Sequence, residues 1–148
     1  MPGTSLKIES CSFGSETASP WPVSDDFILA QDSPVSITDT TFELISCASL
    51  LQVQTVGNFA LVNVDLNSIT TTSDLMRVAA QEISYNPSTI NAINYPDTAC
   101  MFNFISSSAL VRFVGIQFGP ITSTGNVIRI SNTNVLQLVN VRTTQVNG

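Results

Sequence analysis

The sequence predicts an all-β solenoid, a single domain over residues 1–148 made of about five to six stacked coils. Apolar residues alternate with polar ones instead of recurring at helical spacing, and β-branched residues are dense, so strands are expected throughout. The alternating pattern also repeats at intervals of 24 to 29 residues. A unit of that length cannot bury its apolar stripe alone, whereas stacked copies of it can.

Positions in each repeat unit are counted from its first residue, which is position zero. Positions zero and two are apolar, position four is a residue that favours turns, and positions five and seven are predicted to face inward. The turn formers predict a tight corner with left-handed or bridge backbone, which Asn, Asp and Gly accept most easily. We expect buried stacks at positions zero and two, and hydrogen bonds from the corner side chains of Asn63 and Asn140 to the backbone of neighbouring coils. The six units start near residues 6, 35, 59, 83, 111 and 136; position two is Ile8, Ile37, Leu61, Tyr85, Phe113 and Leu138; position four is Ser10, Asp39, Asn63, Pro87, Gly115 and Asn140.

A further strand precedes each of the last five units by eight or nine residues, so each coil is expected to contain three short strands. Coils that pair in parallel lie about 4.8 Å apart. This leading strand is predicted to include Phe27 and Leu29, Leu51 and Val53, Leu75 to Val78, Phe102 and Phe104, and Ile128 and Ile130.

The segments Leu6 to Phe13 and Leu136 to Thr143 resemble coils of the right-handed parallel β-helix proteins of the pectin-lyase-like superfamily. That superfamily often carries Asn at this corner, as Asn63 and Asn140 do here; the other four corner residues depart from Asn. The resemblance covers roughly residues 5–144 and implies a right-handed parallel β-helix. It says little about activity, because the superfamily includes lyases, hydrolases, adhesins and viral spikes. An antiparallel sandwich or jelly roll is the alternative fold, and the constant eight-residue offset between strands weighs against it.

Composition excludes several classes of function. Eleven acidic against five basic residues argue against nucleic-acid binding and against an anionic-membrane surface. The absence of histidine excludes histidine-dependent triads and metal sites. Cys11, Cys47 and Cys100 show neither metal-binding spacing nor a disulfide framework, so we expect small buried apolar side chains and no cofactor or metal. The chain shows no signal peptide and no apolar run long enough to insert into a membrane.

Catalytic residues are not expected. The resemblance implies that an active site would lie on the outer face of the leading strand, where related lyases hold calcium with clustered acids beside a basic residue. Asp74 near Arg77 is interpreted as a surface ion pair of little consequence. The outward candidates on that face include no carboxylate cluster and are Gln52, Gln54, Arg77, Asn103, Arg129 and Ser131.

Two longer loops supply candidate ligand-binding residues. Gly14–Asp26 contains Trp21 between two prolines, and Asn91–Ala99 contains Tyr95-Pro96-Asp97. Trp21, Tyr95 and Asp97 could form platforms for a sugar ring or a partner side chain. The alternative is that each ring folds back to cover the core.

These observations favour a non-enzymatic structural or binding solenoid within a larger surface, adhesin, fibre or virion assembly, and hence an extracellular, cell-surface or virion location. Both ends of a solenoid expose strand edges, so we expect other protein chains, or more of the same polypeptide, to cover at least one end. The alternative is a carbohydrate-active β-helix, lyase- or hydrolase-like, or its non-catalytic sugar-binding remnant, with a carbohydrate as partner.

Overall fold

The computed structural model describes residues 4–14, 20–123, 125–143 and 146–147, and within these it is entirely β-structure. All strand pairs are parallel and belong to one continuous coiled sheet. No helix that is long and apolar enough to cross a membrane occurs in this part of the chain. The strands are β1 (Leu6–Glu9), β2 (Ser12–Gly14), β3 (Trp21–Pro22), β4 (Ile28–Gln31), β5 (Val35–Cys47), β6 (Leu51–Gln54), β7 (Asn58–Thr71), β8 (Met76–Tyr85), β9 (Ser88–Asn94), β10 (Cys100–Val114), β11 (Ile116–Phe118), β12 (Ile121–Thr122), β13 (Asn126–Ser131), β14 (Val135–Val139), β15 (Arg142–Thr143) and β16 (Val146–Asn147).

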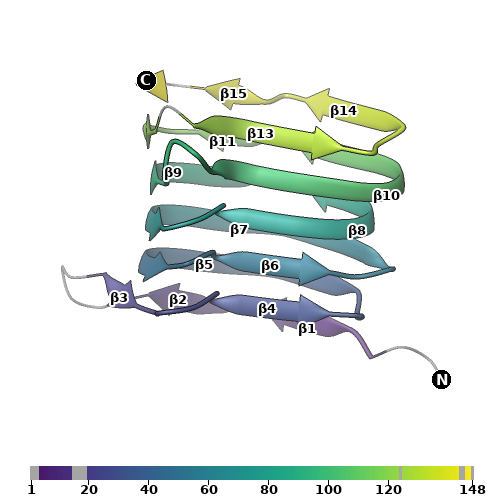
Figure 1. Ribbon diagram of the computed structural model, residues 1–148, viewed down its shortest axis with the longest axis horizontal. Coiled ribbons are helices and arrows are strands. Elements are labelled where there is room, and N and C mark those ends of the chain that lie inside the picture. The colour runs from purple at the N-terminus through teal and green to yellow at the C-terminus, as the bar shows by residue number, and fades with distance from the viewer. Residues whose placement is uncertain (1–3, 15–19, 124, 144–145, 148) are drawn as a thin grey trace.

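The chain winds upward from the N-terminal to the C-terminal end as a solenoid (Figure 1). Strands β4, β6 and β13 cross the near side from left to right and the chain returns behind them, so the winding is right-handed. The first face consists of β4, β6, β13 and the starts of β8 and β10. The second face contains β1, β14, the starts of β5 and β7 and the ends of β8 and β10, and the third face contains β2, β9, β11, β15 and the middles of β5 and β7.

The predicted register of the repeat is confirmed. Position two of each unit pairs with position two of the next, from Ile8 through Ile37 and Leu61 to the sixth unit. The four inner members of this stack are fully buried. At the ends, Ile8 is half-buried and Leu138 is 54% exposed, because each has a neighbouring coil on one side only.

The leading strand of the second unit, predicted to include Phe27 and Leu29, is β4 (Ile28–Gln31). Ile28 and Ala30 pair with Leu51 and Val53 and face inward, whereas Leu29 faces outward beside Gln52 and is 58% exposed. The segment from Phe27 to Ala30 is apolar at every residue, so the pattern of apolar residues does not fix which side chains of this strand face inward.

The corner at position four is left-handed in five of the six units, at Ser10, Asp39, Asn63, Gly115 and Asn140, with φ between 48° and 67°. Pro87 is the exception, because the proline ring fixes φ near −65°. At this corner the buried Ser88 hydroxyl accepts a hydrogen bond from Val64 N at 3.1 Å and donates one to Asn86 O at 2.7 Å.

The predicted backbone hydrogen bond of Asn63 is wrong. Its exposed side-chain amide donates to Asp39 Oδ1 at 2.7 Å, so the two corners are joined through their side chains. The Asn140 side chain is also exposed. Corner side chains point outward and lie one strand spacing from the same corner of the next coil, which places a side-chain partner nearer than any backbone group.

A second corner, which the sequence analysis did not predict, bends the third strand. Leu44, Ser68 and Ala92 have φ values of 51° to 55°, two residues after position seven of their units. A fourth short strand segment follows and stacks Ile45, Ile69, Ile93 and Ile121 in the core, each at most 1% exposed. The regular spacing of these isoleucines is visible in the sequence and could have predicted the fourth strand segment.

The three cysteines are free thiols. Cys47 and Cys100 are buried as predicted, and Cys11 in the first unit is half-buried. Burial, with a smaller contribution from the Asp26 charge, raises the pKa of Cys47 to about 11.

Candidate functional site

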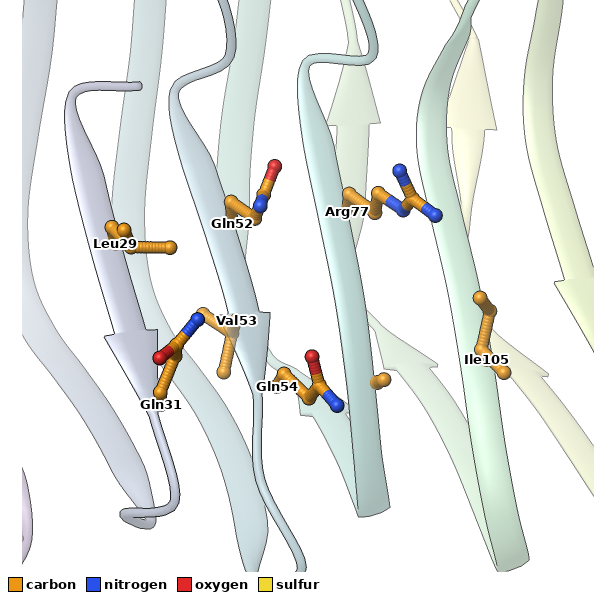
Figure 2. Close-up of a pocket in the computed structure, with 8 residues that line it drawn as sticks. Leu29, Gln31, Gln52, Val53, Gln54, Arg77 and Ile105 are labelled. Carbon is orange, nitrogen blue, oxygen red and sulfur yellow. The ribbon is translucent and has the colours of Figure 1, made fainter. Parts of the chain in front are cut away.

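A shallow depression of about 330 Å³ lies on the outer surface of the first face (Figure 2). Strand register sets two outward rows across it, one through Leu29, Gln52 and Arg77 and the other through Gln31, Gln54 and Ala79. Ala79 pairs with Gln54 on one side and Ile105 on the other, and its short side chain leaves space between these two longer ones. The repeat therefore brings together residues that lie about 24 positions apart in the chain.

The chemistry of this depression is hydrogen bonding without a carboxylate. Three glutamine amides each offer a donor and an acceptor, and Arg77 adds a guanidinium that only donates. The predicted outward residues Gln52, Gln54 and Arg77 line it, while Asn103 and Arg129 extend the first row along β10 and β13. Within the described residues, no group of three His, Cys, Asp or Glu side chains is placed to hold a metal ion.

The interpretation of Asp74 as the surface partner of Arg77 is wrong. Asp74 Oδ1 accepts a hydrogen bond from Cys100 N, and Oδ2 accepts one from Asn103 Nδ2, both at 2.7 Å. These partners belong to the next coil, so the carboxylate joins two coils where their first-face strands begin. Long-range contacts of this kind leave no local signal in the sequence.

Trp21 lies at the N-terminal end of the solenoid, in a group that we call the aromatic cluster: Phe13, Trp21, Phe27 and Phe42. Trp21 meets Phe27 edge to face with ring centroids 5.6 Å apart, and Phe13 stacks on Phe42 at 5.2 Å. Phe27 contacts Phe13 and Phe42 edge to face. Trp21 thus extends the cover over the first coil while remaining 45% exposed.

Tyr95 is not a surface platform, since its side chain is only 3% exposed. Its hydroxyl donates to Gly125 O at 3.4 Å, and Gly125 packs so closely that an added Cβ would lie 3.0 Å from the ring. Burial raises the pKa of Tyr95. Asp97 follows on the same loop and is exposed. Trp21 pairs with Ile45 and Tyr95 packs against Gly125, so the structure does not bring the predicted ligand-binding residues together.

A polar ladder on the third face was missed by sequence reasoning. Asn67 donates to Glu43 Oε1 at 2.8 Å, and Asn91 donates to Asn67 Oδ1 at 3.3 Å. The sequence feature that could have predicted the ladder is the 24-residue spacing of these polar residues, which all occupy position eight of their units. Gly119 occupies the next place, where a Cβ would lie 2.5 Å from Asn91 Oδ1. The side chains of this ladder bond one another, so the ladder ties coils together.

Inward apolar side chains are most exposed on β14, the strand of the last described coil on the second face. Every residue of β14 is exposed, including the inward Leu136 at 47% and Leu138 at 54%. These two side chains cover Val111 and Phe113, which are fully buried, and have no coil above them in the described part of the chain. Val135 and Val139 on the outward side are 46% and 43% exposed.

No protein-family model, no curated protein and no solved structure matches this chain. What the geometry defines is a parallel β-solenoid of about five turns, in which the strand β14 of the last described coil is exposed.

Proposed function

We propose that this chain is a non-enzymatic structural β-solenoid that works as part of a larger surface, adhesin, fibre or virion assembly. Descent from the pectin-lyase-like superfamily and an extracellular, cell-surface or virion location belong to the same proposal. The observation that carries it is the half-exposed pair Leu136 and Leu138 at inward positions of the last coil.

The half-exposed side chains of Leu136 and Leu138 leave apolar surface in contact with water. Fully burying a leucine side chain contributes about 1.5–3 kcal/mol, so covering the exposed halves of two leucines is worth the same amount, about 1.5–3 kcal/mol, before any backbone pairing. The open edge of β14 adds unpaired backbone groups, which other strands readily pair with. Natural solenoids cover such an end with a cap or a neighbour, so the cover here is another chain or further coils of the same polypeptide.

The test measures how much apolar surface the last described coil exposes. At low protein concentration, a dye that fluoresces on apolar surfaces is expected to bind the folded chain, and the double substitution Leu136→Ser with Leu138→Ser is expected to remove most of that signal. The matched control is Ser36→Ala, an outward position on the same face. A folded monomer that binds no dye and never associates would contradict the proposal.

A sugar-binding surface is the second candidate, and the first-face depression favours it. Gln31, Gln52, Gln54 and Arg77 present amide and guanidinium groups suited to hydroxyl or carboxylate oxygens of a glycan. Glycan-array binding that is lost on Gln52→Ala with Gln54→Ala, and retained on Gln137→Ala, would support it. Binding that is unaffected by the double substitution would exclude this depression as the binding site.

A further inference from the structure

Two neighbouring depressions form one continuous groove on the outer side of the solenoid. The first-face depression shares Gln54, Ala79 and Ile105 with a second depression of about 220 Å³, which lies at the corner that follows β4, β6 and β8. This second depression is also lined by Asp32 and by Val56, whose side chain is 83% exposed. The two depressions together, which we call the outer groove, cross the neighbouring strands β4, β6, β8 and β10.

The outer groove has a positive and a negative end. Arg77 lines the first depression, and within the described residues it forms no ion pair with a carboxylate. Asp74, the acidic residue closest to it in the chain, already accepts hydrogen bonds from Cys100 N and Asn103 Nδ2. Asp32 is exposed and lines only the second depression. A carboxylate ligand is therefore attracted to the Arg77 end and repelled from the Asp32 end.

The middle of the outer groove is apolar. Ala79 follows Arg77 by two residues on β8, so both side chains point outward from positions about 6.6 Å apart. Ala79 pairs with Ile105 on β10, and Figure 2 shows the Arg77 guanidinium extending toward the strand that carries Ile105. An apolar group placed over Ala79 would thus contact Ile105, while a carboxylate beside that group would reach the guanidinium.

Two glutamines on β6 add hydrogen-bonding groups beside this apolar middle. Gln52 pairs with Arg77 and Gln54 pairs with Ala79, so the two amides flank the same two outward positions. Each amide offers both a donor and an acceptor, which matches the carbonyl and the N–H of a peptide unit. Sugar hydroxyls would instead lie against the apolar side chains of Leu29 and Ala79, where part of their hydrogen bonding is lost. The lining therefore favours a peptide over a glycan.

We infer that the outer groove binds the carboxyl-terminal end of a peptide whose last side chain is apolar. The terminal carboxylate accepts two hydrogen bonds from Arg77, because guanidinium and carboxylate groups pair in a bidentate manner. The last side chain packs over Ala79 against Ile105, and the preceding peptide unit bonds the amides of Gln52 and Gln54. The structural role proposed above neither requires nor excludes this ligand, so the two proposals are tested separately.

The test begins with four ligands in calorimetric titrations, of which acetyl-Gly-Gly-Leu with a free carboxylate is the probe. The same peptide with a carboxyl-terminal amide is expected to bind at least about tenfold more weakly, because it loses the charge-assisted hydrogen bonds. Acetyl-Gly-Gly-Gly lacks the apolar side chain and is expected to bind about fivefold more weakly. The free acid 4-methylpentanoate has the carboxylate and the apolar chain without a peptide unit, and it is expected to bind about threefold or more weakly.

Two matched pairs of variants locate the site. Arg77→Gln is expected to weaken binding of the probe at least about tenfold, whereas Arg129→Gln removes the same charge from the same outward row and is expected to change it less than about twofold. Ala79→Leu fills the hollow and is expected to weaken binding about fivefold or more, whereas Ser131→Leu adds the same side chain to that row beyond Ile105 and is expected to have no effect. The ligand comparisons use the unmodified chain, so they decide the question even if a variant does not fold.

Several results would overturn the inference. One is the absence of peptide binding up to about 10 mM, which is weaker than any specific recognition needs. Equal affinity for the carboxylate and the amide, or equal losses on Arg77→Gln and Arg129→Gln, would show that the guanidinium of Arg77 does not hold the carboxylate. Binding of 4-methylpentanoate as tight as that of the peptide would make the ligand a free apolar acid. Glycan binding that is lost on Ala79→Leu, without peptide binding, would assign the groove to a sugar.

Discussion

The inner coils and the C-terminal coil use the same repeat positions with opposite outcomes. Leu61 and Leu138 both occupy position two, yet Leu61 is fully buried and Leu138 is 54% exposed. The residue type is identical, so the difference comes entirely from the presence of a coil on each side. In a solenoid, a stripe of apolar residues becomes core only where it has two neighbours.

The N-terminal coil lies between these extremes. Leu6, Ile8 and Phe13 also have a neighbour on one side only, but they are half-buried and packed against the core. The aromatic cluster closes part of this end, with Phe27 in contact with three other rings. The first coil is thus partly capped by its own chain, and the last described coil is not.

The largest expected effect contrasts the two leucines directly. Leu61→Asp places an unpaired charge in the core and is expected to unfold the domain, a loss of more than about 4 kcal/mol. Leu138→Asp at the same repeat position leaves the carboxylate in water and is expected to cost less than about 1 kcal/mol in dilute solution. Urea unfolding followed by circular dichroism measures both, and a Leu61→Asp protein with unchanged melting would refute the register.

The next prediction compares the two ends. Phe27→Ala is expected to destabilise the domain by about 2–4 kcal/mol, because it removes the centre of the aromatic cluster. Leu138→Ala truncates a half-exposed side chain and is expected to cost under about 1 kcal/mol. Equal losses in urea unfolding at low protein concentration would show that the two ends are closed to the same degree.

A smaller effect concerns the inner stack at Tyr85. Its side chain is fully buried, and among the described residues its hydroxyl makes no hydrogen bond. An unsatisfied buried hydroxyl costs roughly 1–3 kcal/mol, so Tyr85→Phe is expected to stabilise the domain by about 1 kcal/mol. A lower melting temperature for Tyr85→Phe would mean that the hydroxyl is bonded in solution.

The last expected effect is confined to alkaline solution and is a pH dependence from the buried thiol of Cys47. Its pKa is raised from 9.0 to about 11, so the folded state holds the proton more tightly than the unfolded state. The contribution is fully present below pH 9 and is lost as the pH rises through about 11. Cys47→Ala is expected to flatten the decline of the urea midpoint over that window, and a decline of the same size in the variant would contradict the assignment.

Much of the fold could be predicted from the sequence because it depends on local pattern. The positions of Asn63 and Gly115 fix left-handed corners, and the apolar stripe fixes the stacking register. The register of β4 could not be predicted, since Phe27, Ile28, Leu29 and Ala30 are all apolar. The second corner also escaped prediction, because Leu44 and Ala92 are not residues that favour positive φ.

The candidate site was less predictable because it depends on contacts between coils. The depth of the first-face depression follows from Ala79 lying beside Gln54 and Ile105 on neighbouring strands. The burial of Tyr95 follows from Gly125, which lies 30 residues further along the chain. The exposure of Leu138 follows from the absence of a further coil in the described chain, and repeat position alone predicts the opposite.

Amide hydrogen exchange along β14 tests most directly the central claim that a repeat position is protected only where a coil lies on each side. The account predicts that the Leu136 and Leu138 amides, which point away from β10, exchange at least about tenfold faster than the Gln137 and Val139 amides, which point toward β10. Equal protection of all four amides in the folded chain would contradict the account.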